Sequence, residues 1–171
     1  MWREVVGPLG RNASVAVLTC ATLSATAAAA GTSRRLGAGR GTVVGLVAFD
    51  LVGGLVAFQM RGTREKYAQS PLRSRLVFAV AHVQPIVLPL IADGSWRRAA
   101  ARYLAAVSMT AVLELVVPPR MPRRLTANGV GLVLSTLDLV SGPSTQRWFG
   151  PVYLMKVVGG HAGIPRGILD V

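Results

Sequence analysis

The sequence contains few charged residues and very few acidic ones. Charged residues make up 15% of its 171 positions, with 19 Lys or Arg against seven Asp or Glu. A soluble domain of this size usually carries about a quarter charged residues, which solvate its surface. Hydrophobic residues make up 51% of the chain, and the mean hydropathy is +0.48. This composition indicates a chain that is surrounded mainly by lipid.

Cysteine is also scarce, and several catalytic motifs are missing. The single cysteine, Cys20, excludes an internal disulfide and a cysteine-based zinc cluster. No Gly-x-Ser-x-Gly elbow is present, and the glycines at 37–41 lack the Gly-Lys-Ser/Thr ending of a phosphate-binding loop. The two histidines lack the tight spacing of a metal motif, so the sequence predicts no cofactor and no metal.

The net charge of +12 would suggest a nucleic-acid partner if the chain were soluble. The basic residues instead lie in short clusters between long apolar runs, and no basic patch is interleaved with aromatic residues. Basic loops beside membrane spans set topology and contact anionic head groups. The sequence therefore predicts membrane lipids as partners and no nucleic acid.

Six apolar runs are predicted as helical spans: 12–30, 42–60, 76–92, 99–117, 126–142 and 148–163. They predict one domain over residues 1–171, an all-α polytopic bundle of about five or six short spans in the inner (plasma) membrane. The first run resembles a secretory signal, but a retained span is favoured because more runs follow. The last run either crosses or is re-entrant. Eleven basic residues against seven favour cytoplasmic termini.

Two of these runs contain residues that disfavour isolated insertion. Asp50, near the centre of the second run, costs about 3 kcal/mol in lipid, so its side chain is expected to face protein. Pro85 and Pro89 in the third run each remove a backbone donor. That run is therefore expected to be kinked, buried in the bundle and packed against the glycine-rich second run.

One side of each of the next two runs carries a stripe of residues at helical spacing, several of them polar. They are Tyr103, Val107, Thr110 and Glu114 in the fourth run, and Asn128, Gly131, Ser135, Asp138 and Gly142 in the fifth.

Six ionisable residues inside the apolar runs form the candidate intramembrane polar site: Asp50, His82, Glu114, Asp138, Lys156 and His161. A rise of about 1.5 Å per residue places Asp50 and Lys156 at similar depth, where they can pair. His82 and Glu114 fall in the same half of the bilayer and could exchange protons or hold a ligand. On an ideal helix Lys156 and His161 are about 140° apart, so they are not expected to share one site. The alternative is that all six groups are structural.

Three short blocks resemble a pattern found in small bacterial polytopic membrane proteins without an assigned activity. They are 49–54 (FDLVGG), Ala81-His82 with Pro85, and 148–151 (WFGP) through Lys156 to Gly160-His161. The resemblance implies a bacterial inner-membrane setting and no catalytic residue.

Three functions stay open, and no catalytic residue is assigned. One is transport or proton coupling along a path lined by Asp50, His82 and Glu114. The second is a membrane-embedded enzyme acting on a lipid or quinone, with a histidine as acid or base and a basic rim for phosphate, for which Arg73, Arg75 and Arg124 are the candidates. The third is a non-catalytic accessory subunit that docks another membrane protein or a second copy.

Overall fold

The structure, a computed structural model, describes residues 7–118, 122–142 and 144–167. These residues form helices and their connections, with no strand among them, so the all-α prediction is confirmed. In chain order the helices are α2 (Arg11–Leu36), α3 (Ala38–Ala57), α4 (Arg61–Ala68), α5 (Leu72–Ala81), the 3₁₀ turn η1 (Gln84–Ile86), α6 (Val87–Leu90), α7 (Trp96–Leu115), α8 (Arg123–Val140), α9 (Phe149–Leu154) and the π-helical η2 (Met155–Ala162).

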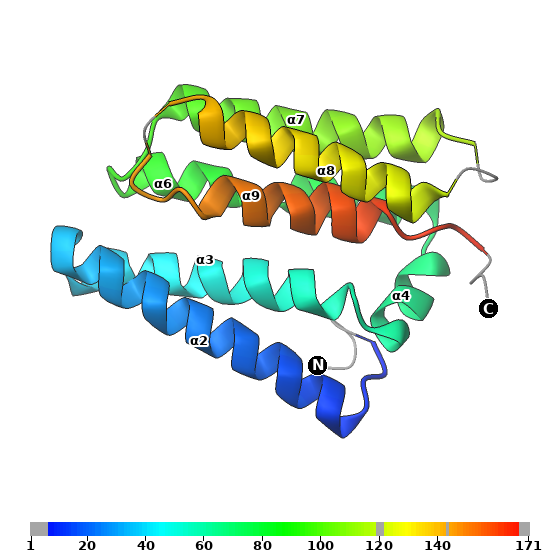
Figure 1. The fold of residues 1–171 in the computed structure, drawn as a ribbon, viewed down its shortest axis with the longest axis horizontal. Coiled ribbons are helices and arrows are strands. Elements are labelled where there is room, and N and C mark those ends of the chain that lie inside the picture. The colour runs from blue at the N-terminus through cyan, green and yellow to red at the C-terminus, as the bar shows by residue number, and fades with distance from the viewer. Residues whose placement is uncertain (1–6, 119–121, 143, 168–171) are drawn as a thin grey trace.

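The long helices lie side by side with their axes roughly aligned, as Figure 1 shows. The α2–α3 hairpin forms one edge, and the other helices pack together beyond it, around α9 and η2. We call the two ends of the bundle the α4 end, where α3 finishes and α8 begins, and the α6 end, where α7 begins. Each of the six predicted runs overlaps one helical run, counting α5–η1–α6 and α9–η2 as one each.

The α2–α3 hairpin is held by close backbone approach. A Cβ built on Gly45 would lie 3.0 Å from the Cβ of Ala29, and one on Gly53 would lie 3.1 Å from the Cβ of Ala21. Small residues let two helices pack at short distance without large side chains between them. Gly45 and Gly53 therefore face α2, whereas Gly54 faces Lys156 of η2, and the expectation that these glycines pack against the proline-containing run is wrong.

The third run is broken, as its prolines predict. α5 ends at Ala81, and the chain passes through η1 into the single turn of α6. Two carbonyls near the break accept hydrogen bonds from tyrosine hydroxyls: His82 from Tyr153 and Val80 from Tyr103, each at 2.9 Å. The expected burial of this run is wrong for α5, since Val77 and Val80 are about half exposed.

The side of α8 that carries Gly131 and Ser135 faces α9 and η2. A Cβ on Gly131 would lie 3.0 Å from the sulfur of Met155, and the Ser135 hydroxyl donates to the carbonyl of Pro151 at 3.4 Å. On α7, Thr110 and Glu114 are buried. Both polar stripes therefore run along the centre of the bundle, where α9 and η2 form the most completely buried segment.

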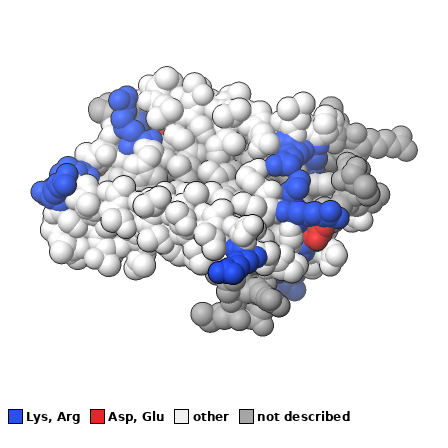
Figure 2. Space-filling model, turned by 60° about the horizontal axis from the view of Figure 1, so that its bottom comes forward, with Lys and Arg blue, Asp and Glu red and all other residues white. Residues whose placement is uncertain are grey.

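The outer surface is largely apolar. Figure 2 shows a broad central area without Lys, Arg, Asp or Glu, with the blue side chains gathered mainly toward the ends. Exposed Leu and Val side chains occur on α2, α3, α5, α7 and α8. In the described part of the chain, α2 and α3 are long and apolar enough to cross a membrane. Further crossings by the other runs remain a prediction.

Candidate functional site

The candidate site begins with an ion pair at mid-length of the bundle. The Lys156 side chain is 3% exposed and its Nζ lies 2.7 Å from Oδ2 of Asp50. Gln84 donates to the same oxygen at 2.8 Å. Gly54 makes room for the lysine, because any Cβ there would collide with the Lys156 side chain. The predicted pairing of Asp50 with Lys156 is therefore present.

Asp50 is nevertheless not enclosed by the fold. Its side chain is 51% exposed, while Lys156 behind it is buried. Both hydrogen bonds reach Oδ2, and Oδ1 has no hydrogen bond in the part of the chain that the structure describes. The expectation that this carboxylate faces the protein is wrong for half of its surface, because α3 carries it at the outer side of the helix.

An aromatic cluster surrounds the two histidines near the α4 end. The ring of Phe78 lies between them, with both centroid distances at 3.9 Å, and His161 is nearly parallel to it. Phe58 and Tyr67 meet His161 edge-on at 5.7 and 5.4 Å. His82 donates from Nδ1 to the Phe78 carbonyl at 2.6 Å, whereas neither ring nitrogen of the fully buried His161 has a hydrogen-bond partner among the described residues. His161 is thus held by ring packing.

Lys156 and His161 both face α3, but they do not share one site, as expected: Lys156 pairs with Asp50, and His161 lies among aromatic rings. Lys156 meets Gly54 of α3, and His161 meets Phe58, one turn further along α3. The reason is that η2 is π-helical, so that residues five apart are stacked along the axis. An angle calculated for an ideal α-helix does not hold there.

Glu114 lies inside a cage of arginines. Its Oε1 is 2.7 Å from Nη2 of Arg75 and 2.8 Å from Nη2 of Arg123, and its Oε2 is 3.6 Å from Nε of Arg166. Arg75 and Glu114 are fully buried side chains. Arg75 also donates to the carbonyl of Tyr67 at 2.8 Å. We call Glu114, Arg75, Arg123 and Arg166 the Glu114 cage, and its geometry is that of a structural cross-link.

The cage changes two sequence-based expectations. No contact joins His82 to Glu114 among the described residues, so the predicted proton exchange between them has no geometric support. Sequence reasoning also missed Arg75 and Arg123 as interior groups, since both were assigned to basic loops. Each instead lies in the first turn of a helix, four residues before a buried alanine, and that spacing was the available signal.

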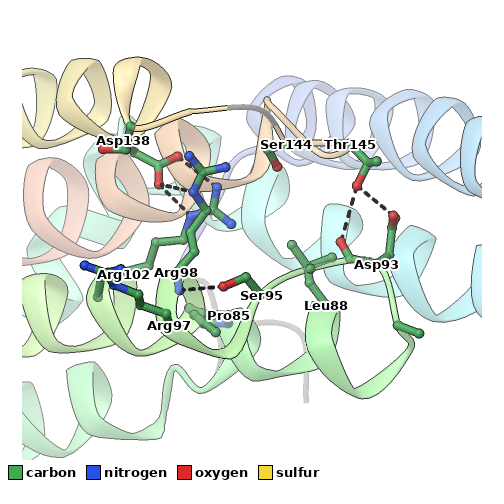
Figure 3. A pocket seen from close by; sticks show the side chains of 15 residues that line it. Pro85, Leu88, Asp93, Ser95, Arg97, Arg98, Arg102, Asp138, Ser144 and Thr145 are labelled. Carbon is green, nitrogen blue, oxygen red and sulfur yellow. Dashed lines mark hydrogen bonds and ion pairs between the residues drawn. The ribbon is translucent and has the colours of Figure 1, made fainter.

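Asp138 belongs to a second cluster, at the α6 end. Arg102 donates to both of its oxygens at 2.8 Å, and Arg98 lies 3.9 Å away. Arg102 is almost fully buried and sits inside the predicted fourth run, where sequence reasoning did not single it out. Gly150 lies beneath the pair and leaves no room for a Cβ. Figure 3 shows both arginines pointing toward Asp138.

Asp93, in the turn after α6, is the other carboxylate of this end. Arg35 donates to both of its oxygens at 2.9 Å, and Thr145 and Gln146 donate at 2.7 Å each. A cavity of about 740 Å³ separates this cluster from the Asp138 cluster. Partial burial opposes ionisation, but these hydrogen bonds and the charge of Arg35 lower the pKa of Asp93 to about 2. The Asp93 cluster therefore ties the α2–α3 hairpin to the rest of the bundle.

Acid should weaken this connection. Because the pKa of Asp93 is about 2 when folded and about 4 when unfolded, its contribution is complete above pH 4 and is lost as the pH falls toward 2. Up to about 2 kcal/mol of the free energy of unfolding should disappear over that window. Unfolding of the parent and of Asp93→Asn, followed by circular dichroism in a non-ionic detergent, measures it. If both lose stability equally between pH 4 and 2, Asp93 is not responsible.

The described residues contain no group of three or more His, Cys, Asp or Glu side chains placed to hold one metal ion. No protein-family model, curated protein or solved structure matches the chain. The geometry alone therefore carries the functional argument: within the described chain, Asp50, Asp93, Glu114 and Asp138 are each neutralised by a Lys or Arg from another helical run.

Proposed function

We propose that this chain is a multi-pass membrane protein whose interior charges are structural, and that it acts as an accessory subunit docking another membrane protein. The carrying observation is the half-exposed carboxylate of Asp50 at mid-length of α3, on a surface that is otherwise apolar. In hydrocarbon a charge at such depth needs a polar partner. Lys156 and Gln84 occupy only one of its two oxygens.

The docking surface, which we call the Asp50 face, comprises Val43, Leu46 and Asp50 of α3 with Val83 and Gln84 at the helix break. Leu46 is 68% exposed and Val83 is 48% exposed, while the Gln84 amide joins the two elements through Asp50. The occupant that fits is a membrane helix of a partner protein with a hydrogen-bond donor or a cation opposite Oδ1.

Photo-crosslinking from the Asp50 face tests this proposal. A photoreactive residue replacing Leu46 should form one discrete protein adduct in native membranes. The same residue replacing Leu132, an equally lipid-like exposed position on α8, should not. The adduct should also require the carboxylate, so it should be lost in an Asp50→Asn/Lys156→Met background, where no buried charge is left unpaired.

The other outcomes reject the proposal in distinguishable ways. Adducts with lipid alone, or equal adducts from Leu46 and Leu132, would show that no protein covers the face. An adduct of twice the chain mass would assign the face to a second copy instead of a different protein. An adduct that persists without the carboxylate would remove Asp50 from the docking contact.

A further inference from the structure

A cavity at the α4 end is lined by three arginines, of which only Arg123 has an ion pair among the described residues. It measures about 480 Å³, a size typical of small-molecule sites, and lies between the end of α3, the start of α8 and the C-terminal part of η2. Arg64, Arg123 and Arg124 line it, and no Asp or Glu does. We call it the arginine pocket.

The hydrogen bonds of these arginines leave donors free. The Arg64 side chain has no hydrogen bond or ion pair in the described part of the chain, and its Nε is buried. Arg124 bonds only Gln59, at 2.7 Å. Arg123 is 4% exposed and donates from Nε to the Ala162 carbonyl, while its Nη2 is ion-paired with Glu114 but has no hydrogen bond among the described residues. A buried donor without an acceptor is costly, so these groups favour an acceptor from outside the chain.

The local charge balance points the same way. Glu114 supplies one negative charge next to three arginines, and Arg64 and Arg124 add two more positive charges nearby. The pocket also includes the first residues of α8, whose backbone N–H groups have no side-chain cap. Free N–H groups at a helix start and several guanidinium groups together favour an anion with several acceptor oxygens.

We propose that the arginine pocket binds the phosphate group of an anionic membrane lipid. Phosphate offers the bidentate acceptors that guanidinium groups prefer. Apart from the amides Gln59 and Asn128, the rest of the lining is apolar. Phe58, Leu125 and Ile164 lie beside the arginines, which suits the glycerol and upper acyl region of a lipid more than a fully hydrated ion. Gly159, Gly160 and Gly163 contribute no side chain to the wall and keep the space open.

The test uses the full chain in nanodiscs of phosphatidylcholine that contain a minor proportion of phosphatidylglycerol. Native mass spectrometry after release should show one retained phosphatidylglycerol per chain, enriched over phosphatidylcholine. Arg64→Gln/Arg124→Gln should lower that enrichment about tenfold or more, since charge-assisted hydrogen bonds are lost. Arg73→Gln, an exposed arginine of α5 outside the pocket, is the matched control and should change it little.

Adding inorganic phosphate separates the two sources of the ligand. If inorganic phosphate displaces the lipid at millimolar concentration, the arginine pocket binds phosphate but its ligand is a soluble phosphate, which overturns the assignment to a lipid. If the lipid stays bound, its head group is the ligand, as proposed. Equal retention of phosphatidylglycerol and phosphatidylcholine would overturn the proposal. An equal loss of phosphatidylglycerol enrichment in Arg73→Gln and in Arg64→Gln/Arg124→Gln would also overturn it. If Arg64→Gln/Arg124→Gln unfolds, Arg64→Gln alone replaces it, because the Arg64 side chain has no hydrogen bond to lose among the described residues.

Discussion

Glu114→Gln is expected to destabilise the protein by about 3–5 kcal/mol, the largest effect of any single charge removal in this bundle. The substitution keeps the size of the side chain but leaves Arg75 and Arg123 buried around a neutral group. Both lie within 2.8 Å of Oε1 in the folded protein. Removing one partner of a buried ionic cluster exposes the remaining charges to the full penalty of burial, which exceeds the value of the pair itself.

Denaturant unfolding in a mild detergent, followed by tryptophan fluorescence, measures the loss. Glu65→Gln is the matched control, since Glu65 pairs with Arg61 at the surface of α4 and its removal should change stability by less than about 0.5 kcal/mol. If Glu114→Gln behaves like Glu65→Gln, water or lipid reaches the cage and the arginines are solvated in the native state.

The second large effect is expected at the Asp50–Lys156 pair, and it should be asymmetric. Asp50→Asn leaves a buried ammonium with no opposite charge, so about 2–3 kcal/mol of stability should be lost. Lys156→Met leaves a half-exposed carboxylate that still accepts from Gln84, so its loss should be smaller. The physical reason is that Asp50 keeps a second hydrogen-bond partner, Gln84, whereas the Lys156 side chain has no other partner among the described residues.

A double-mutant cycle provides the decisive measurement. Asp50→Asn/Lys156→Met removes both charges and should be more stable than Asp50→Asn alone, with a coupling energy of about 1–3 kcal/mol. The photo-crosslinking test uses the same double variant, because it removes the Asp50 carboxylate without leaving Lys156 as an unpaired buried charge that would destabilise the fold. Additive losses in the cycle would mean that the two side chains do not interact in the native protein.

Of the three functions predicted from sequence, the positions of the charged groups support docking better than transport or acid-base catalysis. A transport path would need Asp50, His82 and Glu114 to be joined, whereas Glu114 is enclosed by arginines and His82 bonds its own helix. An acid-base role for His161 would need access, and its ring is fully buried among aromatic rings. The docking role needs only an exposed polar group on an apolar surface, and Asp50 is such a group.

The structure changes which arginines are candidates for binding phosphate. Of the three arginines predicted as phosphate ligands, Arg124 lines the arginine pocket, Arg75 is ion-paired with Glu114, and Arg73 lies on the surface of α5. Arg64 and Arg123 take the places of the other two. Sequence reasoning could locate the basic end of the bundle but could not tell which guanidinium groups were already paired.

Hydrophobic periodicity, proline and charge scarcity determined the helical class, the positions of the six apolar helical runs and the break near Pro85, whereas α4 lies where no helix was predicted. These features depend on residues close in sequence, whose effects on the backbone are local. Depth along a helix was enough to pair Asp50 with Lys156, because rise per residue is nearly constant.

Only the tertiary structure decided what each charge meets and which side of it stays open. Arg75, Glu114 and Arg123 are far apart in the chain, and their meeting depends on how α5, α7 and α8 pack. The π-helical turn that aligns Lys156 with His161 and the exposure of Asp50 likewise follow from packing around η2. Contacts of this kind are set by the relative placement of whole helices, which a local sequence pattern does not encode.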